Sequence, residues 1–270
     1  MNSKLSHPIL IYDQERAGKE WSRLLRQDVI GVRFESGPNQ ENPPGMILSL
    51  IIISDISGHV MVFDVLTNPE ILHNVCFKSL MEADRPIKVM FHPENESKRL
   101  WSLAGIRVHG VFDPQTLYMV KEAIQMKLPT RKFGNQRKTL TELCQLYSVE
   151  CGYDKKQVKR MLQDNPSLFM ERPPIGDLMG ILYESARCLI PLYGEMRGEL
   201  DVAVVQQKYS QILEEYLYGG LEVSDRRQFE RQKRDRNYQE TKQFQKDHGR
   251  EALSNGDKEL LRRGRPHKYN

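Results

Sequence analysis

The sequence predicts an α/β fold, in which a mixed β-sheet is flanked by helices and followed by a helical C-terminal extension. Three apolar segments rich in β-branched residues come first, at residues 29–35, 46–53 and 60–65. Strand-like and helical segments then alternate, and after residue 114 helical patterns dominate. Strands followed by alternating elements and then helices are the order expected of a mixed sheet covered by helices.

The first half of the chain supplies the predicted sheet. Residues 9–27 read as a lead-in with one short helix, and the first strand follows. The second and third strand segments are joined by a turn at residues 55–58, which predicts a β-hairpin. Residues 86–92 and 108–112 predict two more short strands, separated by a helical stretch that ends near Ala104.

The second half is predicted to be mostly helical. Thr139-Leu-Thr-Glu142 has the spacing of a capping box, in which the threonine hydroxyl and the glutamate each bond a free amide of the first turn. Residues 175–196 and 200–217 show long helical patterns, and Gly219-Gly220 ends the second of them. We therefore expect a lead-in over 1–28, a core domain over 29–196, a helix within 197–221 and a charged tail over 222–270.

The charge of the chain is unevenly distributed. The net charge is +4, but residues 222–270 hold 14 Lys/Arg against 9 Asp/Glu, so the remainder is close to neutral. A near-neutral domain does not bind phosphates over its whole surface, and any nucleic-acid contact must come from local clusters. The tail has few apolar residues and no heptad, which predicts disorder or a solvated single helix.

The cysteines and the termini bear on location. Four cysteines are present without a C-x-x-C spacing, which argues against a zinc site or a disulfide framework and suits a reducing compartment: Cys76, Cys144, Cys151 and Cys188. The first residues lack an apolar segment of signal-peptide length, and no stretch approaches the length that spans a bilayer. We expect a soluble, cytoplasmic protein.

Five motifs occur in order along about two thirds of the chain. They are Val29-Ile-Gly-Val-Arg33-Phe-Glu35, Lys88-Val-Met-Phe-His92, Val111-Phe-Asp-Pro-Gln115, Lys138-Thr-Leu-Thr-Glu142 with the helix it opens, and the segment from Arg172-Pro-Pro to Leu192-Tyr193. Together they resemble the motifs of ribonuclease D-like and Werner-type 3′–5′ exonucleases. The resemblance implies a ribonuclease H-like fold.

The family's chemistry requires four carboxylates that hold two magnesium ions and a tyrosine that positions the attacking water. Aligned with these positions, the chain has five residues, of which two are acids: Arg33, Glu35, Glu96, Ile181 and Ser185. Glu96 takes the second-motif position if Phe91 replaces the family's histidine. A register through Tyr183 instead ends on Arg187, so the last acid is lost in both.

The substitutions predict an inactive site with no catalytic residues and no metal. Arg33 would repel a metal ion by roughly 4 kcal/mol per pair of unit charges at ~4 Å and an effective dielectric of ~20. Two readings of Arg33 stay open: it contacts an RNA phosphate, or it neutralises Glu35 or Glu96. Glu35 is read as an ion-pair partner, and His92 as a packed or capping residue.

A basic cluster precedes the capped helix and contains one aromatic residue. Its members are Lys127, Arg131, Lys132, Phe133, Arg137 and Lys138. Cations with an interleaved aromatic suit single-stranded RNA, through phosphate contact and base stacking. The alternative is a solvated loop.

Two further patterns suggest contacts with partners. Five residues of the last long helical pattern recur at spacings of three and four, and predict either a dimer seam or docking onto the parent domain: Val202, Val205, Tyr209, Ile212 and Tyr216. Near the C-terminus, Arg262-Arg-Gly-Arg-Pro266 resembles an AT-hook core and the arginine–glycine stretches that Tudor domains bind. The alternative for it is a solubilising tail.

A degenerate domain of this kind resembles the inactive exonuclease-domain proteins of piRNA biogenesis. The resemblance implies a homodimeric adaptor for single-stranded RNA that requires no cofactor, works with a Tudor-domain partner and resides in cytoplasmic germ granules. RNA-transport adaptors with exonuclease-like domains are similar by the same logic. Two alternatives stay open: an active 3′–5′ exonuclease with a rearranged metal site, and a protein-only dimerisation scaffold.

Overall fold

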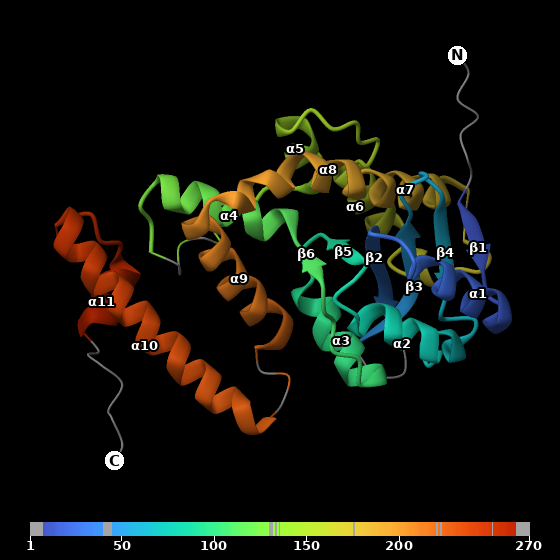
Figure 1. Ribbon diagram of the computed structural model, residues 1–270, viewed down its shortest axis with the longest axis horizontal. Coiled ribbons are helices and arrows are strands. Elements are labelled where there is room, and N and C mark those ends of the chain that lie inside the picture. The colour runs from blue at the N-terminus through green and yellow to red at the C-terminus, as the bar shows by residue number, and fades with distance from the viewer. Residues whose placement is uncertain are drawn as a thin grey trace. The chain divides into compact units, whose positions relative to one another are not determined.

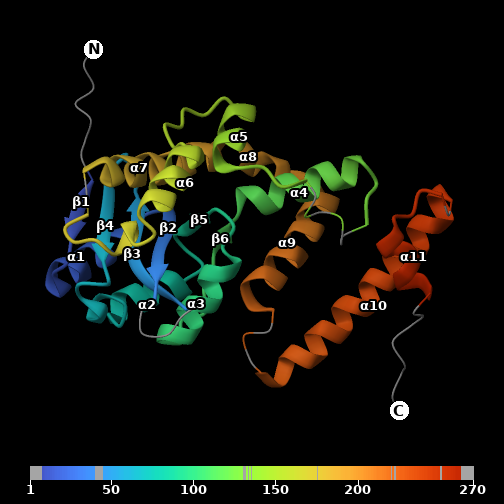
Figure 2. The same ribbon diagram turned by 180° about the vertical axis from the view of Figure 1, so that it is seen from behind.

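The chain forms two compact units, each of which contains two separate segments. Unit 1 comprises Met1–Gln115 and Lys138–Leu200, and unit 2 comprises Thr116–Arg137 and Asp201–Asn270. The structure is a computed structural model (Figures 1 and 2). It describes residues 8–39, 45–129, 132, 134, 136–174, 176–219, 221, 223–249 and 251–262.

Unit 1 is built on a six-stranded mixed sheet in the order β1-β4-β3-β2-β5-β6. Its strands are β1 (Ile9–Ile11), β2 (Val29–Pro38), β3 (Met46–Ser54), β4 (Val60–Asp64), β5 (Ile87–Met90) and β6 (Val111–Phe112). Strands β2, β3 and β4 pair antiparallel, whereas β1 joins β4 and β5 joins β2 in parallel. The predicted hairpin and central strands are confirmed.

One face of the sheet is covered by α1 (Gln14–Leu24), α2 (Val75–Glu82) and α3 (Glu94–Ala104) (Figure 1). Side chains of Ile30, Val32 and Phe34 alternate along β2 toward this layer. Trp21 of α1 is fully buried, and its ring stacks on Phe63 of β4 with the centroids 3.5 Å apart.

The other face is covered by α6 (Lys155–Asp164), α7 (Gly176–Arg187) and η3 (Leu168–Met170) (Figure 2). A second apolar core lies here around Leu50, Ile52 and Leu182. Gly31 of β2 allows the helical layer to approach closely, since a Cβ atom there would lie 3.1 Å from the carbonyl oxygen of Ala186. The remaining elements of unit 1 are η1 (Pro69–Ile71), α5 (Leu140–Leu146) and α8 (Leu189–Met196), with η4 (Arg197–Asp201) at its end.

Unit 2 consists of helices. It contains α9 (Ala203–Tyr218), α10 (Val223–His248), α11 (Asn255–Arg262) and most of α4 (Pro114–Gln125). Arg236 of α10 forms a bidentate ion pair with Glu215 of α9, with 3.0 Å between Nη2 and Oε2, and Lys208 Nζ lies 3.2 Å from Glu240 Oε1. The ion pairs bridge α9 and α10.

Two expectations from the sequence are corrected by these elements. The lead-in contains a strand, β1, as well as its helix, and both belong to the main fold. Of the two readings of residues 222–249, the single helix is found, as α10, and a second helix, α11, follows it in the tail. The tail is not fully solvated, since Thr241 of α10 and Asp257 of α11 are fully buried and Leu253, between the two helices, is 4% exposed.

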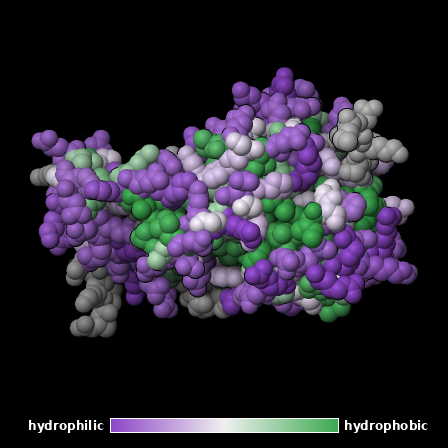
Figure 3. All heavy atoms as spheres, turned by 45° about the horizontal axis from the view of Figure 1, so that its top comes forward, coloured by the Kyte–Doolittle hydropathy of each residue, from purple (hydrophilic) through white to green (hydrophobic). Residues whose placement is uncertain are grey.

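The surface of the molecule is mostly polar, as expected when apolar side chains are buried in its cores. In Figure 3 hydrophilic side chains cover most of the visible face, with smaller apolar areas between them. Among the described helices, none combines the length and the apolar character needed to cross a lipid bilayer.

Candidate functional site

The motif-aligned positions Arg33, Glu35, Glu96, Ile181 and Ser185, which we call the relict metal site after the metal site that the resemblance implies, begin on strand β2. Because neighbours on a strand alternate between its faces, Arg33 and Glu35 lie opposite the first apolar core. Arg33 Nη2 is 3.1 Å from Glu35 Oε1, and the two side chains are only 17% and 16% exposed. Of the two readings of Arg33, the structure shows the ion pair.

The environment of Glu35 disfavours its charged form. Burial raises the pKa of the Glu35 carboxyl, and the positive charge of Arg33 opposes this effect only in part. A buried carboxylate that has lost its water depends on its counter-ion. Arg33 is therefore fixed in place by the acid next to it.

Glu96 lies in the first turn of α3 and is also held by an arginine. Its Oε2 is 3.2 Å from Arg99 Nη1, and Arg99 additionally donates a hydrogen bond to Ser36 Oγ. Burial raises the pKa of Glu96, and the negative charge of Glu35 raises it further. The structure thus brings Glu35 and Glu96 into electrostatic contact, as their motif positions predict.

A buried aspartate positions the backbone before α3. Asp113 Oδ1 accepts hydrogen bonds from the backbone amides of His92, at 3.1 Å, and Gln115, at 3.0 Å. His92 has a left-handed backbone with a φ of 60°, and its side chain is partly buried. The packed or capping role expected for His92 agrees with this local arrangement.

The two positions on α7 carry no ionisable group. Ile181 is 8% exposed and packs in the second core. Ser185 is 1% exposed, and its hydroxyl donates a 2.8 Å hydrogen bond to the carbonyl oxygen of Leu182. In the alternative register, the Arg187 guanidinium lies 5.9 Å from the centroid of the Tyr183 ring.

These residues do not fit a two-magnesium site. Mg²⁺ prefers carboxylate and water oxygens in an octahedral arrangement, and a two-metal site requires several acids that bridge the ions. Glu35 and Glu96 remain, but each is paired with an arginine. A guanidinium at position 33 supplies positive charge where a metal ligand must supply negative charge.

Tyr153 is a member of this region that sequence reasoning missed. The Arg33 guanidinium lies 5.1 Å from the centroid of the Tyr153 ring, which is a cation–π distance. Burial raises the pKa of the Tyr153 hydroxyl. Tyr153 lies between α5 and α6, outside all five motifs, so no pattern in the sequence indicated it.

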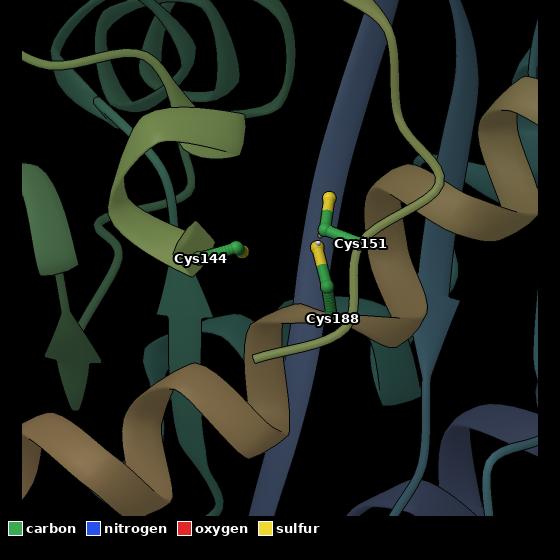
Figure 4. A group of neighbouring side chains, drawn as sticks. All are labelled: Cys144, Cys151 and Cys188. Atoms are coloured by element: carbon green, nitrogen blue, oxygen red, sulfur yellow. Dashed lines mark hydrogen bonds between the residues drawn. The ribbon is translucent and has the colours of Figure 1, made fainter. Parts of the chain in front are cut away.

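A cluster of three cysteines was also missed. The Sγ atoms of Cys144, Cys151 and Cys188 all lie within 4.8 Å of one another, and those of Cys151 and Cys188 are 3.5 Å apart (Figure 4). Hydrogen bonding with the Cys144 and Cys188 thiols lowers the pKa of Cys151. Spacing rules found no such group, because the three residues meet only through the tertiary fold.

The proposed RNA-binding residues have different environments. Lys132 Nζ lies 3.1 Å from Oδ2 of the fully buried Asp257 and 5.0 Å from the centroid of the Phe244 ring. Lys127 and Arg137 are exposed, and Lys138 is partly buried. Arg131 and Phe133 lie outside the described residues. Lys132 thus has a structural partner in unit 2, and Lys127 and Arg137 are the exposed cations among the described members of the predicted cluster.

Helix α10 adds basic residues that the motif search passed over. Four of its exposed basic side chains fall within one third of the helix circumference, at a rotation of ~100° per residue, and the exposed Asp235 lies among them. We call this third the basic face of α10, with Arg231, Arg234, Lys242 and Lys246. The sequence analysis did not single these residues out, because basic residues without an interleaved aromatic residue form no specific RNA-binding motif.

The predicted seam on α9 is largely buried within the chain. Val205, Tyr209 and Ile212 are 5–6% exposed, Tyr216 is partly buried, and Val202, before the helix, is 52% exposed. These side chains are therefore buried within the chain, and both docking onto the parent domain and self-association stay predictions. Of the C-terminal Arg-Gly motif, only Arg262 at the end of α11 is described.

Solved structures of 3′–5′ exoribonucleases share this fold. Trypanosoma brucei RNase D has a TM-score of 0.63 and 20% identity over 79% of this chain and 74% of that chain. The Aedes aegypti Nibbler EXO domain has a TM-score of 0.56 and 18% identity over 80% and 98%, and Escherichia coli RNase D has 0.54 and 13% over 78% and 50%. No family profile and no curated protein match the sequence. The fold is therefore ribonuclease H-like, of the exonuclease type.

Proposed function

We propose that this protein is a catalytically inactive exonuclease homologue that binds single-stranded RNA and serves as an adaptor, as in piRNA biogenesis. The ion pair between Arg33 and Glu35 carries this proposal, because Arg33, a buried cation, occupies the motif position at which the resemblance to exonucleases implies the first catalytic acid. RNA binding is supported by the fold, since T. brucei RNase D has been solved in complex with RNA U12.

The RNA contacts in this proposal come from exposed cations and not from the relict metal site. Lys127 and Arg137 supply two of them, and the basic face of α10 supplies others. For a protein bound to single-stranded RNA, each phosphate contact that is removed reduces the slope of log K against log salt by about 0.7. Homodimerisation, a Tudor-domain partner and a place in germ granules belong to the same proposal.

The test combines cleavage and binding in the same samples. A 5′-labelled single-stranded RNA is incubated with the full chain and Mg²⁺ or Mn²⁺, and both retention and shortening are scored. We expect retention without shortening, unaffected by chelator. Metal-dependent shortening that disappears in Glu35→Ala would replace the proposal with an active exonuclease.

A charge-reversal pair then locates the contacts. Lys127→Glu combined with Arg137→Glu should weaken RNA binding and lower the slope of log K against log salt by about 1.4. Arg26→Glu, which reverses an exposed charge outside the cluster, serves as the matched control. Equal RNA affinity in all three proteins would remove the cluster from the proposal, and absence of any RNA binding would favour a protein-only scaffold.

A further inference from the structure

Three of the four cysteines of the chain converge from separate segments of unit 1. Cys144 lies on α5 and is fully buried, Cys188 precedes α8 and is 1% exposed, and Cys151 lies half-buried between α5 and α6. Figure 4 shows the three side chains gathered together. Among the described residues, this is the one group of three His, Cys, Asp or Glu side chains close enough to share a metal ion.

The sulfur spacing matches metal coordination. A zinc–thiolate bond of ~2.3 Å in tetrahedral geometry places two sulfur atoms ~3.8 Å apart. The Cys151–Cys188 separation of 3.5 Å lies just below this value, and all three sulfurs lie within 4.8 Å. Side-chain shifts of less than an ångström would therefore bring the three sulfurs to a common ion.

The charges around the cluster suit the complex that would form. Three thiolates and one divalent cation carry a net charge of −1, which needs compensation in a buried place. Two guanidiniums are close enough to interact with the sulfurs: Arg33 with Cys188 and Arg187 with Cys151. An aspartate at position 33 would instead repel such a complex.

We propose that Cys144, Cys151 and Cys188 bind a thiophilic cation with a filled d shell, with Zn²⁺ as the expected ion. The three sulfurs fill three positions, and water or an external ligand takes the fourth. Binding exchanges up to three thiol protons for the ion, and these protons pass to solvent. A disulfide would use only two of the sulfurs and leave the convergence of the third unexplained.

The metal would join the segments that surround Arg33. It would tie α5, the segment leading to α6 and the junction of α7 with α8 to one point. Tyr153 follows Cys151 by two residues and stacks on Arg33, so the ion would also fix this contact. The proposal is independent of RNA binding, since the cluster contains none of the proposed RNA contacts.

Metal content provides the test. The full chain is purified without a histidine tag or added chelator, and zinc and copper are measured by elemental analysis. We expect close to one zinc per chain and, after exchange with Co²⁺, the thiolate charge-transfer and tetrahedral ligand-field bands. Cys151→Ser should lose most of the bound metal. Cys76→Ser is the matched control, because Cys76 is partly buried and lies outside the cluster.

Several results would overturn the proposal. A metal-free chain whose intact mass is two hydrogens lower would indicate a disulfide, and a metal-free chain with all thiols reactive after unfolding would indicate simple packing. Zinc that is retained in a folded Cys151→Ser variant would place the ligands elsewhere. If that variant fails to fold, the intensity of the thiolate-to-cobalt band in the unmodified chain counts the sulfur ligands, and fewer than three refutes the site.

Discussion

Lys88→Met should stabilise the protein near neutral pH and lose this advantage in alkali. Lys88 lies on β5 opposite Ile30 of β2, and it is fully buried. Its ammonium group donates a hydrogen bond to the carbonyl oxygen of Ala83, and the charge of Asp84 only partly offsets the effect of burial on it. Burial lowers the pKa of Lys88 from 10.5 to about 8.

The size of the effect follows from this shift. A depressed lysine pKa means that the unfolded chain binds the proton more tightly, so stability rises with pH between the folded and the unfolded pKa. At pH 7 the shift costs roughly 3 kcal/mol, and a methionine would recover about 2 kcal/mol after the lost hydrogen bond to Ala83 is subtracted. From pH 7 to pH 10 the unmodified chain should regain about 2.5 kcal/mol relative to the variant.

Urea unfolding followed by circular dichroism at pH 7, 8, 9 and 10 would measure this difference. Lys19→Met is the matched control, because Lys19 is 73% exposed and its pKa is raised by hydrogen bonding to Glu15. The control should show no gain of the unmodified chain with rising pH. A constant difference between Lys88→Met and the unmodified chain across the range would refute the reasoning.

Three further substitutions probe packing and charge. Glu35→Gln should lower the free energy of unfolding by about 3–5 kcal/mol, because it leaves the Arg33 guanidinium buried without its counter-ion, and urea unfolding should show that adding Arg33→Met restores much of the loss. Trp21→Ala should cost about 3–5 kcal/mol in the same assay, since the ring is fully buried and stacked; a loss below 1 kcal/mol would contradict this packing. Asp257→Ala removes the buried partner of Lys132 and should increase amide hydrogen exchange in α11, while unchanged exchange would show that the ion pair does not hold this helix.

Local sequence patterns were sufficient to predict the central strands and the helix cap at Thr139. The apolar segments that became β3 and β4 are long and bounded by a turn, and the capping box at Thr139 forms as its spacing predicts. Strand β1 has only three residues, which are too few to show the alternation of apolar and polar residues that predicts a strand. It exists because β4 offers a parallel edge, and this information is tertiary.

Residues of the candidate site could be predicted from the sequence only where they belong to one of the five motifs. The positions of Arg33, Glu35 and Glu96 follow from their motifs, and the fold brings them together. Tyr153 and the three cysteines belong to no motif, since their neighbours are distant in sequence. The helices of the tail depend in a similar way on partners elsewhere in unit 2, as the contact of Arg236 with Glu215 illustrates.

The place of β1 and α1 in the fold determines where the chain can be shortened. A fragment that began at residue 29, where the recognisable motifs start, would lack the strand that covers the edge of β4 and the tryptophan that fills the core beneath it. Unpaired amide and carbonyl groups along β4 would then be exposed and available to other chains, which is a common route to aggregation. Fragments intended to represent unit 1 should therefore retain β1, although no motif of the exonuclease family includes it.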